Sequence, residues 1–188
     1  MISANRTAAQ IIHLSRVACA SGAAEDFTPA QWAALRFTAG ANKLSATPGG
    51  FARFHGVTKG AASQILSGLT RRGLLKLSVT TGDRRRRILT LTEKGRDALA
   101  RDPAARLGKA IAALSPQERT ALESGLRALV RTLAAPPCNI AVFGLCADCA
   151  HRGPRLQLAC LAHDPVPPAE DRGGLCVDFI PASESISR

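Results

Sequence analysis

Residues 54–75 read FHGVTKGAASQILSGLTRRGLL, and this stretch decides the fold. Two short helical patterns are joined tightly at HGVT, where Thr58 is a good cap for the second and Gly73 a natural stop. The apolar residues of the second pattern fall on one side at helical spacing: Ala61, Ala62, Ile65, Leu66 and Leu69. This arrangement predicts a helix-turn-helix.

The other side of this second helix is polar or basic and carries no carboxylate. An α-helix fits the major groove of B-DNA, where short polar side chains reach base edges and Lys and Arg hold phosphates. A merely solvated face usually mixes Glu with its Lys. We therefore predict DNA contacts from Thr58, Lys59, Ser63, Gln64, Ser67 and Arg71.

A basic hairpin is expected directly after this helix. Residues 74–92 alternate apolar and polar positions on both sides of a TGD turn, the pattern of a two-stranded wing. Four consecutive arginines suit a narrow minor groove between two rows of phosphates, and Asp83 can orient one of them through a bidentate pair. The wing adds four predicted DNA contacts: Asp83, Arg84, Arg85 and Arg86.

Further helices are expected on both sides of this unit. Thr28, Pro29 and Gln31 give one strong helix start, and Ser115 with Glu118 gives another full capping box. An amphipathic helix is expected over 7–23. Thr92 starts a helix that Pro103 interrupts or separates from the next, and Pro136 ends the last one.

Charge divides the chain into two unequal parts. Residues 1–135 carry 21 Lys and Arg against 8 Asp and Glu, or +13, whereas residues 136–188 carry 4 against 6, or −2. A strongly basic field indicates a polyanionic partner. We expect a DNA-binding and dimerisation domain over 1–135, a Cys-rich metal-binding extension over 136–180, and a flexible tail over 181–188.

The first part resembles the MarR family of winged-helix transcriptional regulators. The resemblance covers roughly residues 7–135 and rests on TPAQWAALRF, FHGVTKGAASQILSGLTRRGLL and TTGDRRRRILTLTEKG. It implies a mainly α fold with a two-stranded wing and dimerisation helices at both ends. It also implies a homodimer on a pseudo-palindromic operator, usually as a repressor, with two recognition helices in successive major grooves. Family members respond to a small phenolic ligand, an oxidised thiol or a metal, and the resemblance does not choose among them.

Five of the six cysteines lie in the extension. Cys146 and Cys149 form a chelating Cys-x-x-Cys pair, and with Cys160 and Cys176 they give a four-thiolate set. Such a set suits Zn²⁺, our first expectation, or an iron–sulfur cluster. Either His163 or Cys138 could replace Cys176 as a ligand. The extension lacks a clear apolar core, so a metal would supply its folding free energy.

The alternatives are a thiol-based redox-sensing regulator without metal and a thiol oxidoreductase using Cys146 and Cys149. No catalytic set accompanies that pair, so we expect no enzyme. No apolar stretch approaches the roughly 20 residues that cross a membrane, and we expect a cytoplasmic protein. A regulatory metal centre is expected to act through the last helix, where Pro136 ends it.

Overall fold

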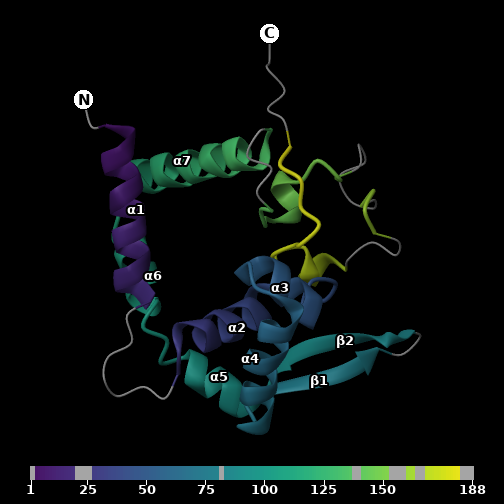
Figure 1. Cartoon of the computed structure of the whole chain (residues 1–188). Coiled ribbons are helices and arrows are strands. Elements are labelled where there is room, and N and C mark those ends of the chain that lie inside the picture. The colour runs from purple at the N-terminus through teal and green to yellow at the C-terminus, as the bar shows by residue number, and fades with distance from the viewer. Residues whose placement is uncertain are drawn as a thin grey trace.

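A computed structural model describes residues 3–19, 27–80, 83–136, 141–152, 160–163 and 168–182, without the side chains at positions 19, 80 and 83–86. Within these ranges the chain folds into seven α-helices and one two-stranded antiparallel sheet (Figure 1). The elements are α1 (Ala4–Cys19), α2 (Pro29–Gly40), α3 (Pro48–His55), α4 (Lys59–Arg71), β1 (Leu75–Thr80), β2 (Asp83–Leu91), α5 (Glu93–Leu99), α6 (Ala105–Ala112) and α7 (Pro116–Ala134). The mainly α fold with a β wing is therefore confirmed.

Five helices begin where a hydroxyl side chain caps them, because that oxygen accepts a hydrogen bond from an otherwise unpaired backbone N–H. The caps are Thr28, Thr47, Thr58, Thr92 and Ser115. Both predicted capping boxes form, at Thr28 and at Ser115. These local signals explain why the sequence predicted the helix starts closely.

The turn between α3 and α4 depends on a glycine. Gly56 has a φ of 65°, a left-handed conformation that costs a residue without a Cβ little. Gly73 has a φ of 71° and follows α4, so that the chain leaves the helix and enters β1. The predicted helix-turn-helix and hairpin are thus both present.

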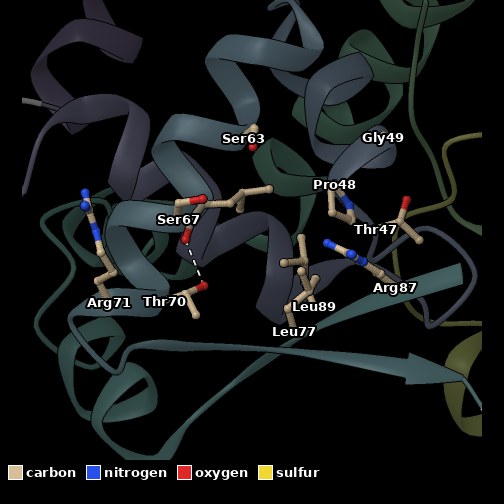
Figure 2. Close-up of a pocket in the computed structure, with 11 residues that line it drawn as sticks. Thr47, Pro48, Gly49, Ser63, Ser67, Thr70, Arg71, Leu77, Arg87 and Leu89 are labelled. Atoms are coloured by element: carbon tan, nitrogen blue, oxygen red, sulfur yellow. Dashed lines mark hydrogen bonds between the residues drawn. The ribbon is translucent and has the colours of Figure 1, made fainter. Parts of the chain in front are cut away.

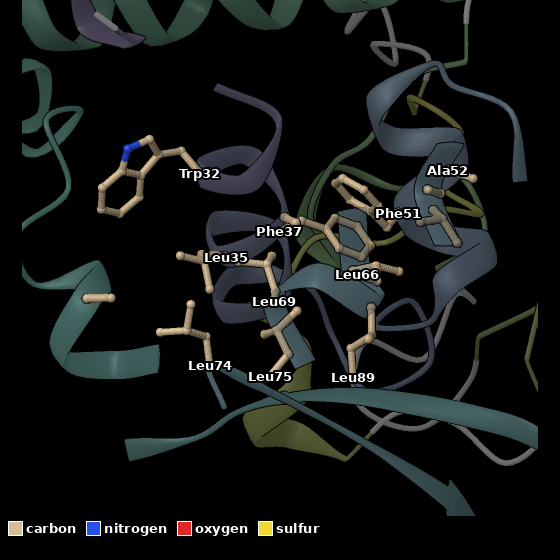
Figure 3. Packing of buried hydrophobic residues seen from close by; sticks show 14 residues of the cluster. Trp32, Leu35, Phe37, Phe51, Ala52, Leu66, Leu69, Leu74, Leu75 and Leu89 are labelled. Carbon is tan, nitrogen blue, oxygen red and sulfur yellow. The ribbon is translucent and has the colours of Figure 1, made fainter. Parts of the chain in front are cut away.

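The core lies between α2, α3, α4 and the base of the sheet (Figure 3). Trp32, Leu35 and Phe37 come from α2, while Phe51 of α3 lies 5.8 Å from Phe37 between ring centroids. Leu69 of α4 is also fully buried. Burying each large side chain contributes roughly 1.5–3 kcal/mol, so this cluster fixes α3 and α4 against α2.

The outer half of the wing extends beyond this core. Leu75 pairs with Leu91 and Leu77 with Leu89, and both Leu75 and Leu89 are buried. Val79 is 56% exposed, so the apolar alternation that predicted the strands continues beyond the buried base. The wing therefore projects from the body of the domain, as Figure 1 shows.

Pro103 lies between α5 and α6, which are separate helices. The Arg36 guanidinium of α2 donates two hydrogen bonds to the Asp102 carboxylate in this connection, at 2.6 and 2.5 Å. Burial raises the pKa of Asp102, but the hydrogen bonds from Arg36 and from the Ala104 N–H outweigh it, and the pKa lies below its ordinary value. The ion pair fixes where α6 leaves the domain.

Helices α1, α6 and α7 extend away from this body (Figure 1). None of their described residues is buried. Among the described residues, no helix combines the length and the apolar composition of a membrane span. Within the described part of the chain, these three helices therefore have no core of their own.

Candidate nucleic-acid interface and thiol cluster

Helix α4 presents the predicted polar face to solvent. Thr58 caps the helix by accepting a hydrogen bond from the Ala61 N–H at 3.2 Å. The residues of the face are all exposed: Thr58, Lys59, Ser63, Gln64, Ser67 and Arg71. Ala62, Leu66 and Leu69 are buried on the opposite face. The spacing argument therefore placed these side chains correctly, while their contact with DNA stays a prediction.

A groove runs beside this face, between α4, the start of α3 and the wing (Figure 2). Ser63, Ser67 and Arg71 line it from α4. The capped start of α3 lines it with Thr47, Pro48 and Gly49, and Arg87 approaches from β2. The groove thus joins a helix face, a capped helix N-terminus and a basic strand on one surface.

Two parts of this groove were missing from the predicted contacts. Arg87 is the last of the four consecutive arginines but is not among the predicted DNA contacts, and neither is any residue at the start of α3. Arg87 pairs with Val79 in the sheet, and its exposed side chain lies at the groove. The pairing register was the missing information, because it decides which arginine returns toward α4.

The wing tip is described in its backbone only. Asp83 begins β2, and Arg84, Arg85 and Arg86 follow within the strand. The side chains of all four lie outside the described residues. Residues 53–96 nevertheless carry eleven Lys and Arg against two acidic residues, so this part of the domain is strongly basic.

The four predicted metal ligands come together from separate segments. Cys146 begins a short 3-10 helix, Cys146–Asp148, and Cys149 follows it. The backbone of Cys160 forms isolated β-bridges with Arg152 and His163. The Cys176 N–H donates to the Gly144 carbonyl at 2.9 Å. Burial raises the pKa of the Cys146 thiol, and the nearby sulfurs of Cys176, Cys149 and Cys160 raise it further. Cys146 therefore lies near the other three cysteines, and none of the four forms a disulfide.

His163 and Asp178 lie at one side of this cluster. The ligand atoms of His163, Cys176 and Asp178 all lie within 4.8 Å of one another. His163 Nε2 is 3.2 Å from Asp178 Oδ2 and makes no hydrogen bond. That His163 is the fourth ligand in place of Cys176 stays a prediction, and the ligand atoms of the two residues lie within 4.8 Å of each other. Cys138 lies outside the described residues.

Comparison with known proteins matches residues 25–86 to the MarR family. The DNA complex of S. aureus MepR has a TM-score of 0.55 and 18% identity, covering 70% of this chain and 97% of that chain. A point mutant of S. aureus MepR has a TM-score of 0.52 and 20% identity, covering 70% and 98%. A probable transcriptional regulator from Pseudomonas aeruginosa has 27% identity and a TM-score of 0.49, covering 68% and 97%.

No curated protein sequence matches the chain. The two MepR structures share its fold over about 70% of the chain. The family match includes α2, α3, α4 and most of the wing, and it excludes the thiol cluster. Residues 25–86 of the chain therefore match the MarR family, and the chain shares the fold of the MepR structures.

Proposed function

We propose that the chain is a sequence-specific DNA-binding transcriptional repressor that binds a pseudo-palindromic operator as a homodimer. We also propose that Cys146, Cys149, Cys160 and Cys176 hold a metal centre. The carboxylate-free face of α4 beside the basic strand β2 carries the DNA-binding proposal.

The chemistry of the groove suits DNA. Ser63, Gln64 and Ser67 offer short hydrogen-bonding groups for base edges, while Lys59 and Arg71 offer charge for phosphates. The wing arginines then reach the adjacent minor groove. MepR, which shares the fold, was solved as a DNA complex.

The homodimer accounts for the exposed apolar residues of α1 and α7. Leu122, Leu126, Leu129 and Leu133 recur at helical spacing along α7 and are 38–46% exposed. On α1, Ile12, Leu14 and Val17 are 54–57% exposed. Apolar faces of this length are stable in water when a second surface covers them. A second copy, related by a two-fold axis, also matches the symmetry of a palindrome.

The coarse assignment as a regulator, and not an enzyme, agrees with the family match. Repression is the finer part of the proposal and rests on the resemblance to a family whose members are mostly repressors. A reporter whose promoter carries the operator tests it: transcription should fall when the chain is produced. A rise in transcription would identify an activator.

Selection from a pool of random duplexes tests sequence-specific binding. We expect one inverted repeat to be enriched. The double variant Ser63→Ala, Ser67→Ala should then lose about 1–3 kcal/mol of discrimination for each base contact removed. Ser124→Ala on exposed α7 is the matched control. Recovery of unrelated sequences, or unchanged discrimination in the double variant, would contradict the proposal.

A further inference from the structure

The segment that carries Cys176 is fastened to the helix-turn-helix through its backbone. The Leu175 N–H donates to the Gly40 carbonyl at 2.7 Å, and the Asn42 N–H donates to the Leu175 carbonyl at 3.0 Å. Two residues later, the Val177 N–H donates to the Ser45 hydroxyl at 3.0 Å in a buried contact. Residues 175–177 therefore pack as a short extended segment on the α2–α3 connection.

Helix α3 holds the same segment by side chains. The Arg53 guanidinium donates to the Asp178 carboxylate at 2.9 Å and to the Val177 carbonyl at 2.7 Å. Phe54 meets Phe143 edge-on, with ring centroids 5.1 Å apart. The Val177 side chain belongs to the core cluster of the winged helix. The basic part of the chain, residues 1–135, and the slightly acidic part, residues 136–188, thus share one packed interface.

Cys176 lies in the middle of these contacts. It follows Leu175 and precedes Val177, both of which bind the α2–α3 connection, and it is itself 6% exposed. Its thiol belongs to the four-thiol cluster. Among the described residues of this C-terminal part, three are buried, namely Cys176, Val177 and Phe179. A group that joins the four thiols therefore adds to the contacts that keep this segment in place.

The distances between the sulfur atoms indicate which kind of metal centre binds them. Tetrahedral zinc with Zn–S bonds of about 2.3 Å would hold its sulfurs about 3.8 Å apart. Among the described residues, the only three ligand atoms within 4.8 Å of one another are those of His163, Cys176 and Asp178. No three of the four sulfurs are that close. In a cubane cluster each thiolate binds a different iron, so the sulfurs lie farther apart than around one ion.

We infer that Cys146, Cys149, Cys160 and Cys176 bind an iron–sulfur cluster that holds residues 171–179 on the helix-turn-helix, so that DNA affinity depends on the cluster. This inference rests on the proposed function and names its regulation. Without the cluster, the segment loses its common link, and Ser45 and Arg53 lose their partners. Helix α3 packs directly on α4 and lines the DNA groove, so loosening α3 weakens DNA binding.

The first test is the composition of the full chain purified without oxygen. We expect visible absorption, with iron and acid-labile sulfide in equal amounts. Cys176→Ser should lose both, while Cys19→Ser on α1 should keep them. A colourless protein with one zinc ion, or with no metal, would overturn the cluster.

The second test uses two adjacent glycines. A Cβ at Gly174 would lie 2.6 Å from the Asn42 backbone nitrogen, whereas a Cβ at Gly173 meets nothing within 4 Å. Gly174→Ala should therefore push the segment off the α2–α3 connection, and Gly173→Ala should not. We expect Gly174→Ala to weaken operator binding about tenfold, within the range typical of coupled sites, with Gly173→Ala unchanged.

Cluster-free wild-type chain provides the comparison that needs no variant. Its amides at 40–57 should exchange hydrogen faster than in the loaded chain, and its operator affinity should fall. Equal exchange and equal affinity in the two forms would overturn the inference while leaving DNA binding intact. Failure of the loaded chain to select any DNA sequence would instead overturn the proposed function.

Discussion

Replacing Leu129 with Asp should separate the proposed dimer without unfolding the winged helix. Leu129 lies on α7, is 46% exposed and has no part in the core cluster. Its apolar surface is expected to face the same helix of the second copy. The substitution therefore acts on association and leaves the packing of α2, α3 and α4 unchanged.

The magnitude follows from the exposed fraction of the side chain. Full burial of a leucine contributes roughly 1.5–3 kcal/mol, so covering about half of one contributes about 1 kcal/mol. Placing a carboxylate there adds a desolvation cost of at least about 1 kcal/mol. Two copies per dimer give a loss of roughly 4 kcal/mol, which raises the dimer dissociation constant about 1,000-fold.

Sedimentation equilibrium across a range of chain concentrations measures this constant, and circular dichroism checks that the helices remain. Ser124→Asp is the control, because Ser124 lies on α7 away from the leucine face and is exposed. We expect the control to remain dimeric. An unchanged dissociation constant in Leu129→Asp, with the fold intact, would refute the assignment of this face to the dimer.

Three further substitutions test the domain. Arg87→Ala should weaken binding to all duplexes and lower the slope of log affinity against log salt by about 1, if Arg87 meets one phosphate; an unchanged slope would remove it from the interface. Asp102→Asn should lower the free energy of unfolding by roughly 1–2 kcal/mol at pH 7, since it weakens the hydrogen bonds with Arg36. The pKa of Asp102 is lowered in the folded chain, so the stability that its carboxylate contributes is present above the ordinary pKa and is lost as the pH falls. Urea unfolding should therefore show a smaller difference in stability between Asp102→Asn and the wild-type chain at pH 3 than at pH 7. Equal differences at the two pH values would contradict the ion pair. Thr28→Ala should cost about 1 kcal/mol of stability by removing a helix cap, measured by thermal unfolding against exposed Thr132→Ala, and a loss no larger than that control's would contradict the capping role.

The helix-turn-helix could be predicted because its signals are local. Thr58 and Gly73 mark the ends of α4 within a single stretch, and the spacing of Ala62, Leu66 and Leu69 decides which face is buried. The wing was predicted from alternation. Its register was not, and therefore the position of Arg87 beside α4 was not either.

The place of the thiol segment could not be read from the sequence. The contact of Arg53 with Asp178 joins residues 125 positions apart, and no local sequence pattern predicts it. The charge map indicated a separate module acting through the end of the last helix near Pro136, and Asp148 of that module does lie 3.7 Å from Arg127 of α7. The structure also packs residues 175–178 on α3 and its preceding connection. That second contact depends on long-range packing and not on composition.

Hydroxyl-radical footprinting on the selected duplex tests the central claim most directly. The account predicts protection on one side of the duplex at two half-sites, centred about one helical turn apart, because each α4 of a homodimer enters one major groove. Protection beyond both half-sites should mark the wings. Uniform protection along the duplex, or a single protected half-site, would contradict the claim that this chain reads a palindrome as a winged-helix dimer.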